Sequence, residues 1–215
     1  TALVLAPAVL AAIIYLPNAW LAMLVALVMV FAQRELALLA GVKPGPGLIV
    51  GMLAVLPPIA ALWLWPASQI PVLIISAALW LLSLLWLGAI QRGKARHGKW
   101  RLAKLILSYL MTIPAWLALS RLHALHPAWL ICLLFLVWGA DVGAYAAGKT
   151  LGRHKLAPSI SPGKTWEGLV GGLVTAVLVV FIAAHWGQQY GRPILLLLLS
   201  AAIALISVGG DLLVS

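Results

Sequence analysis

Long apolar stretches follow one another along the whole chain, and short polar or Pro/Gly-containing stretches separate them. About 20 consecutive apolar residues span a bilayer as a helix, and shorter stretches do so when the helix is tilted or packed against others. The pattern predicts an all-α polytopic membrane protein of about eight transmembrane helices. The expected helix ranges are 2–16, 19–40, 47–65, 71–90, 104–121, 128–148, 167–186 and 194–213.

Three prolines fall inside these predicted helices. Pro57 and Pro58 interrupt the third helix, and Pro114 interrupts the fifth. Membrane helices tolerate such breaks when neighbouring groups satisfy the freed carbonyls. We therefore expect a single transmembrane domain over residues 1–215, with local interruptions.

Composition supports the same class. The chain is 65% hydrophobic and 8% charged, whereas soluble domains carry about 25% charged residues. This excludes an ordinary soluble domain. The lone cysteine, Cys132, lies within an apolar stretch and is interpreted as a packing residue.

The basic residues divide unequally between alternate loops. Arg121 and Arg192 fall on one side of the predicted membrane. The other side receives the remaining twelve: Arg34, Lys43, Arg92, Lys94, Arg96, Lys99, Arg101, Lys104, Lys149, Arg153, Lys155 and Lys164. The positive-inside rule places that side, with the N-terminus, in the cytosol. The net charge of +10 is thus explained by topology, and we expect no nucleic-acid partner.

All four acids lie near the predicted cytosolic ends of helices: Glu35, Asp141, Glu167 and Asp211. Asp141 comes eight residues before Lys149, which corresponds to about 12 Å along a helix. A carboxylate at that depth is costly unless it has a partner or a water-filled cavity. Asp141 is either paired with a nearby lysine or part of a metal or substrate site open to the cytosol, and we favour the site.

Residues 143–150, "GAYAAGKT", match the Walker A phosphate-loop pattern formally. Such a loop requires a strand before it and a helix after it. Here a membrane helix precedes the motif, and a Gly- and Pro-rich segment follows it. We reject the Walker interpretation, and we expect Gly139, Gly143 and Ala147, at four-residue spacing, to form a small-residue face for helix packing.

The segment 148–168, "GKTLGRHKLAPSISPGKTWEG", nevertheless has the composition of a phosphate site. Hydroxyls of Ser161 and Thr165 accompany free N–H groups at the start of the next helix. The available cations are Lys149, Arg153, His154, Lys155 and Lys164. The loop 91–104 has many cations but no acid or hydroxyl residue, so it fits topology and lipid headgroups alone.

Two weaker patterns complete the list. In "SVGGDLLVS", Ser207 and Asp211 are spaced i, i+4 on one helix face, and Asp211 is a candidate second carboxylate beside Asp141. His123 and His126 are spaced i, i+3 on the opposite side of the membrane, and we interpret them as interfacial.

The segment 136–173, "LVWGADVGAYAAGKTLGRHKLAPSISPGKTWEGLVGGL", resembles the bacterial phosphatidate cytidylyltransferases, or CDP-diacylglycerol synthases. The cores S-P-G-K-T-W-E-G and G-R-H-K-L-A-P carry the resemblance, which extends over essentially the whole chain. It implies transfer of the cytidylyl group from CTP to phosphatidate, which gives CDP-diacylglycerol and pyrophosphate, at the bacterial inner membrane.

The resemblance also implies roles for single residues. Asp211 and Asp141 are expected to bind Mg²⁺, the expected cofactor, with a second cation left open. With Lys164 they form the expected catalytic set. The residues expected to bind or position substrate are Lys149, Arg153, Lys155, Ser161, Thr165 and Tyr145.

The chain departs from the family pattern at Val142, where Ser or Thr is frequent, and at Val214, where Glu is usual. The family's C-terminal signature falls after Ser215. We therefore expect a fragment, trimmed at both ends, that folds but does not catalyse.

Two alternatives stay open. A CTP-dependent polyprenol or phytol kinase would transfer the γ-phosphate of CTP to an alcohol. A non-catalytic transporter would explain the hydrophobicity, but it does not require a hydroxyl-rich basic loop. The expected partners are CTP, phosphatidate and membrane lipids, and a homodimer is left open.

Overall fold

The computed structural model describes residues 2–91, 101–158, 161–186 and 193–214, with side chains over 4–82, 102–158, 161–185 and 196–210. Of the residues that the structure describes, 86% are helical. Within the described ranges, five helical segments are long and apolar enough to cross a bilayer, and three shorter apolar helices accompany them. The predicted class, an all-α polytopic membrane protein, is confirmed.

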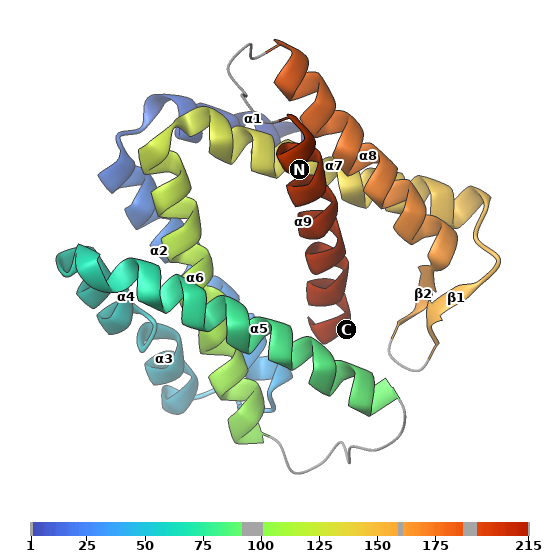
Figure 1. The fold of residues 1–215 in the computed structure, drawn as a ribbon. Coiled ribbons are helices and arrows are strands. Elements are labelled where there is room, and N and C mark those ends of the chain that lie inside the picture. Colours follow the sequence, from blue (N-terminus) through green and yellow to red (C-terminus); the bar gives the residue numbers. More distant parts are fainter. Residues whose placement is uncertain (1, 92–100, 159–160, 187–192, 215) are drawn as a thin grey trace. The chain divides into compact units, whose positions relative to one another are not determined.

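The helices and strands follow the predicted order closely (Figure 1). The first half of the chain contains α1 (Ala2–Tyr15), α2 (Asn18–Leu39), α3 (Pro46–Leu53), α4 (Leu56–Leu64), the 3-10 turn η1 (Pro66–Ser68), α5 (Gln69–Gln91) and α6 (Arg101–Leu125). The second half contains α7 (Pro127–Thr150), β1 (Lys155–Ala157), β2 (Ser161–Thr165), α8 (Trp166–Trp186) and α9 (Pro193–Val214).

These elements group into two compact units, each described by itself. The first unit consists of Thr1–Trp86 and Ala95–Leu130, and the second consists of Leu87–Lys94 and Ile131–Ser215. The expectation of a single transmembrane domain remains a prediction.

In the first unit, α2 and α6 pack along each other in opposite directions. Gln33, fully buried near the end of α2, donates from Nε2 to Ser108 Oγ near the start of α6 at 2.8 Å. Further along α6, Trp116 Nε1 donates to the carbonyl of Ala22, near the start of α2, at 2.8 Å. Polar contacts between membrane helices fix their register. The surrounding apolar core consists of Ala22, Val30, Val55, Ile59, Leu62, Trp116 and Leu117.

In the second unit, α7 and α8 approach each other through small residues. Thr175 Oγ1 on α8 donates to the carbonyl of Gly139 on α7 at 2.8 Å. A Cβ at Gly143 would lie 2.3 Å from Thr175 Oγ1, and one at Gly171 would lie 2.4 Å from Ala147 Cβ. The predicted small-residue face on α7 is therefore confirmed. Leu136, Ala140, Ala176, Val180 and Ala204 form the core of this unit.

The structure confirms one local prediction and corrects two. The predicted interruption of the third helix is present, because this segment forms two helices, α3 and α4, separated just before Pro57. Pro114 lies inside α6 without ending it. The segment after α7 contains an antiparallel hairpin in which Lys155 pairs with Thr165 and Ala157 with Ser161. Its strands are too short, and too rich in Pro and Gly, to produce an alternating apolar pattern.

Candidate active site

A cavity of about 440 Å³ lies in the second unit, between α7, the hairpin, α8 and the last turns of α9. Its volume is within the range of small-molecule sites, about 300 to 1,000 Å³. The polar side chains that line it belong to Asp141, Tyr145, Lys149, Lys164, Thr165 and Ser207. Leucines 156, 169 and 173 and four glycines complete much of the wall. The cavity is thus a polar site surrounded by apolar helices.

Helix α7 contributes Asp141, Tyr145 and Lys149, spaced by four residues and therefore on one helix face. Lys149 Nζ donates to Tyr145 Oη at 3.3 Å and lies 5.5 Å from the centre of its ring. All three side chains are exposed to the cavity or its mouth. One face of α7 therefore presents a carboxylate, a phenol and an ammonium group to a ligand.

Because α7 continues through Thr150, residues 143–150 are helical, and the rejection of a Walker loop is confirmed. The helix ends at a tight turn that requires glycine. A Cβ at Gly152 would lie 2.1 Å from the carbonyl oxygen of Gly148 and 2.9 Å from Thr165 Cγ2. The close turn brings β2 back against the end of α7.

Strand β2 contributes Lys164 and Thr165. Thr165 is buried, and its Oγ1 accepts a hydrogen bond from the N–H of Gly168 at 3.1 Å. This is the geometry of a helix N-cap, and it orients the first turn of α8. The cap fixes Thr165, and it leaves the hydroxyl proton for another acceptor. Lys164, one residue earlier, is half-buried in the cavity wall.

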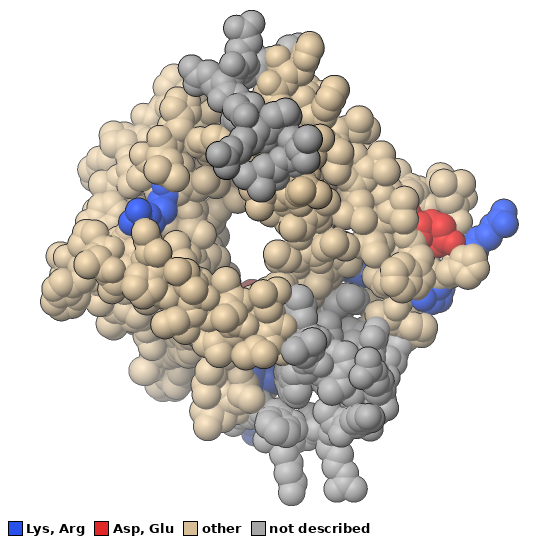
Figure 2. All heavy atoms as spheres, in the orientation of Figure 1, with Lys and Arg blue, Asp and Glu red and all other residues tan. Residues whose placement is uncertain are grey.

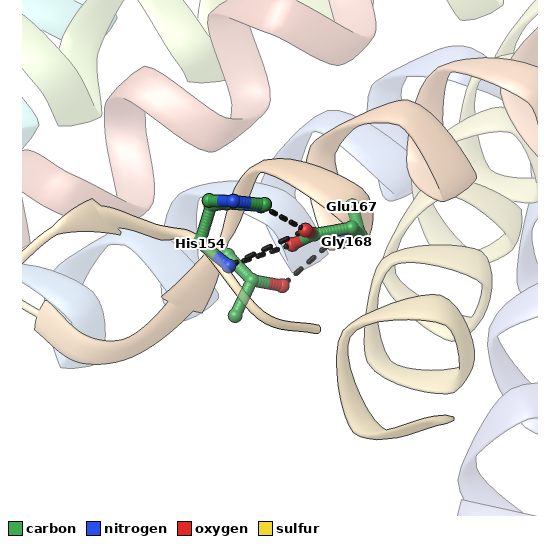
Figure 3. A network of polar contacts seen from close by, with 4 residues as sticks. His154, Glu167 and Gly168 are labelled. Carbon is green, nitrogen blue, oxygen red and sulfur yellow. Dashed lines mark hydrogen bonds and ion pairs between the residues drawn. The ribbon is translucent and has the colours of Figure 1, made fainter. Parts of the chain in front are cut away.

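His154 and Glu167 join the start of the hairpin to α8 (Figure 3). His154 Nδ1 lies 2.7 Å from Glu167 Oε1, and the His154 backbone N–H is 3.3 Å from both carboxylate oxygens. The Trp166 N–H donates to the carbonyl of His154 at 2.9 Å. An acid in the first turn also interacts favourably with the helix dipole. Glu167 therefore pins the hairpin against α8, beside the cavity wall.

Charged atoms gather where the hairpin meets α8. Figure 2 shows basic and acidic atoms close together in this region. Arg153 and Lys155 are exposed there but do not line the cavity, and half-buried Ser161 does not line it either. Their proposed phosphate contacts remain predictions.

Asp211 lies in the last turn of α9, and its side chain is outside the described residues. Ser207, one turn earlier, lines the cavity. The sequence indicated Ser207 only through its i, i+4 spacing with Asp211. The sequence did not indicate the contact between His154 and Glu167. The acid directly after "PGKTW" is a signal for the start of a helix, but it does not identify His154 as the partner of Glu167.

The donor set limits the type of metal that fits. The described residues contain no group of three or more His, Cys, Asp or Glu side chains placed to hold a metal. Mg²⁺ commonly binds through one or two carboxylates, with waters and substrate phosphates as its other ligands. Asp141, beside two lysines, fits a metal that enters with a polyphosphate, and it does not fit a closed protein-only metal site.

Comparison with known proteins relates the chain to cytidylyltransferases. The sequence profile of the Cytidylyltransferase family matches residues 1–215. A phosphatidate cytidylyltransferase of Pseudomonas aeruginosa is 35% identical over 216 residues, which covers 99% of this chain and 79% of the relative. Proteins of the same name from Haemophilus influenzae and Rickettsia bellii are 36% and 40% identical, over 67% and 51% of this chain and 55% and 52% of their own lengths. No solved structure matches the chain significantly.

Proposed function

The chain belongs to the cytidylyltransferase family, and on that premise we propose that it transfers the cytidylyl group of CTP to phosphatidate. The products are CDP-diacylglycerol and pyrophosphate. Family membership makes the protein a nucleotidyltransferase, and its apolar helices make it a multi-pass membrane protein. The observation that carries the proposed substrates is the 440 Å³ cavity, which is lined by Asp141, Lys149 and Lys164 and lies between apolar helices.

The proposed reaction is an in-line displacement at phosphorus. A phosphate oxygen of phosphatidate attacks the α-phosphorus of CTP, and the bond from that phosphorus to the bridging α,β-oxygen breaks. The negative charge that develops passes to the leaving pyrophosphate. Catalysis of this type depends mainly on positioning and on charge stabilisation, so no covalent protein nucleophile is required.

The chain's own residues supply both of these effects. Among the described residues, Lys149 and Lys164 are the cations that line the cavity, and we assign them to the phosphates of the two substrates. Tyr145 holds Lys149 from the same helix face, and the Thr165 hydroxyl can orient a phosphate oxygen. Fixed donors at the site of developing charge are worth more in a cavity from which water is excluded than in bulk water.

Mg²⁺ is the proposed cofactor, held by Asp141 and by Asp211, whose side chain is outside the described residues. Bound there, the ion would neutralise negative charge on the polyphosphate. Loss of the Asp141 carboxylate should therefore lower activity by about two orders of magnitude or more. Mutation of residues that only hydrogen-bond to metal ligands already lowers metal affinity or activity by about 10- to 100-fold. Asp141→Asn should also raise the Mg²⁺ concentration required for half-maximal rate.

We also propose that the cavity faces the cytosol of a bacterial inner membrane. Four basic residues surround or adjoin the cavity: Lys149, Arg153, Lys155 and Lys164. The positive-inside rule favours the cytosol for such a segment. In this arrangement CTP enters from the cytosol, and phosphatidate enters from the bilayer.

Position-labelled CTP tests the proposed reaction. Because residues 1–215 alone are expected not to catalyse, the assay uses these residues together with the family's C-terminal signature segment. In phosphatidate-containing micelles this protein should move the α-phosphate label of CTP into lipid and release the γ-label as pyrophosphate, and transfer should stop when EDTA removes divalent ions. Appearance of the γ-label in lipid would identify a kinase instead. Stable binding of CTP without transfer of either label would count against enzymatic transfer by this chain.

A further inference from the structure

A second cavity, of about 280 Å³, lies in the first unit, where the last turns of α6 meet the start of α2 and the turn between α4 and α5. Its lining includes Asn18, Trp63, Gln69, Trp116, Ser120 and Arg121. The proposed cytidylyl transfer uses none of these residues. An ionisable side chain within a membrane-spanning segment more often belongs to a functional site than to a packing contact. The cavity that contains Arg121 therefore requires its own explanation.

Arg121 is held in this cavity by a neutral group. Its Nη1 donates to Gln69 Oε1. Gln69 is buried, and its Nε2 donates to the carbonyl of Leu62 at 2.7 Å, which fixes the direction of the amide oxygen. The guanidinium has five N–H donors in a planar fork. In the described part of the chain the partner of Arg121 is this amide, so its positive charge is positioned but not neutralised.

Ser120, the preceding residue on α6, provides an independent observation. Its side chain is 4% exposed, and Ser120 Oγ has no hydrogen-bond partner among the described residues. A buried hydroxyl without a partner is unfavourable and is uncommon in folded proteins. Because Ser120 lines the same cavity as Arg121, a ligand that accepts hydrogen bonds would satisfy both side chains.

The rest of the cavity is apolar and reaches the protein surface. The rings of Trp63 and Trp116 lie 6.3 Å apart, and Trp63 is 44% exposed. Leu125 also lines the cavity and is 73% exposed. A soluble anion gains little from such a rim, whereas the glycerol and acyl groups of a lipid gain apolar contact. Tryptophan is also the residue typical of the membrane interface.

The position of the cavity excludes a topological role for its arginine. His123 lies 3.1 Å from the side chain of Asn18, so this end of α6 adjoins the start of α2. The basic residues Arg34, Lys43 and Lys104 lie toward the opposite ends of these two antiparallel helices. Arg121 therefore stands apart from the charges that orient the protein.

We propose that this cavity binds the phosphate group of a membrane phospholipid, at the membrane face opposite Arg34 and Lys104. Arg121 pairs with the phosphate oxygens, and Ser120 Oγ donates to the phosphate. Trp63 and Leu125 contact the apolar part of the lipid. The site is separate from the cavity proposed for catalysis, and its occupant need not be a substrate.

Native mass spectrometry of the purified protein can test this site. Phosphatidylglycerol provides one phosphate with two acyl chains, diacylglycerol provides the chains alone, and inorganic phosphate provides the anion alone. We expect saturable binding of phosphatidylglycerol, weaker binding of diacylglycerol, and no displacement of bound lipid by millimolar inorganic phosphate. Equal binding of both lipids would overturn the phosphate contact. Displacement by inorganic phosphate would overturn the lipid as occupant.

Variants then locate the bound lipid. Arg121→Gln should weaken the tightest phosphatidylglycerol site about tenfold, the scale of one charge-assisted hydrogen bond. Arg34→Gln removes the same charge elsewhere in the unit and should not change that site. Ala124→Leu, which fills the cavity rim without altering charge, should also weaken binding. It decides the question if Arg121→Gln does not fold. Wild-type affinity in Ala124→Leu, or in a folded Arg121→Gln protein, would overturn the proposal.

Discussion

Lys164 is the cationic side chain that the hairpin places in the wall of the proposed active site. Lys164→Ala should lower kcat/KM for CTP by roughly 1 to 3 kcal/mol of transition-state stabilisation, or about 5- to 150-fold, because a charge-assisted hydrogen bond to phosphate is lost. Steady-state assays at varied CTP measure this effect. Lys104→Ala, at an exposed lysine of α6 in the other unit, should leave kcat/KM unchanged. Small and equal effects at both positions would mean that Lys164 serves topology alone.

At the residue scale, the sequence determines which residues share a site only where helix periodicity determines their position. The four-residue spacing of Asp141, Tyr145 and Lys149 is sufficient to place them on one face of α7, and the structure places all three at the cavity. No such rule governs the hairpin. Lys155 and Lys164 are both basic residues of the same loop, yet only Lys164 lines the cavity. Strand register decides which of them faces inward, and in a hairpin the register depends on the turn geometry, which the apolar pattern of such short strands does not specify.

At the scale of elements, the contact between α7 and α8 depends on the absence of a side chain at Gly143. An added Cβ would lie 2.3 Å from Thr175 Oγ1 and 2.8 Å from the backbone oxygen of Gly171. Gly143→Ala should therefore cost about 1 to 3 kcal/mol of stability, the usual scale of overpacking. Thermal unfolding in detergent measures it. Gly47→Ala, in α3 with no atom within 4 Å of the added Cβ, should be neutral or slightly stabilising. Equal melting temperatures for both variants would contradict the packing argument.

The hairpin depends on a single side chain of α8. Glu167→Ala removes the carboxylate that contacts both the ring and the backbone of His154. Because the pair is partly exposed, we expect a moderate effect: roughly three- to tenfold faster hydrogen exchange at the backbone amides of residues 154–158 and 161–165. Amides in the interior of α7 and α8 should keep their protection.

Lys155→Ala is the matched control for this exchange experiment. The residue is adjacent to His154 and exposed, so its truncation should not change hairpin protection. If Glu167→Ala and Lys155→Ala exchanged alike, Glu167 would have no role in pinning the hairpin.

Hydropathy predicted the helices because each one must be apolar to lie in lipid. It did not predict the hairpin, whose fold rests on a cap at Thr165 and on the contact between His154 and Glu167. Pro114 is a case in which the sequence predicted a helix break that the structure does not contain. Proline statistics suggested an interruption, but α6 continues through this residue, since packing in a membrane protein can compensate for one lost hydrogen bond.

At the scale of the whole molecule, the distribution of Lys and Arg between the loops predicts the membrane topology. In a protein whose Cys132 has been replaced by alanine, single cysteines at Lys155 and His126 should react with an impermeant maleimide from opposite sides of the membrane. The twelve-to-two division of basic residues is the reason. Labelling of intact cells and of inverted vesicles distinguishes the two sides. Reaction of both cysteines from the same side would require a different topology.

The exposed cations of the hairpin have a kinetic consequence. Arg153 and Lys155 stand outside the cavity on a segment fixed by Glu167. If the cavity faces the cytosol, as proposed above, these two residues present a positive field to cytosolic nucleotides. A nucleotide with several negative charges would be drawn toward the cavity mouth before it makes any contact. Such attraction weakens as salt shortens the Debye length, to about 8 Å near 0.15 M. The association rate of CTP, measured as kcat/KM, should therefore fall as ionic strength rises, while kcat at saturating CTP stays constant. At low CTP concentrations the ionic strength of the cell would then limit the rate of the reaction.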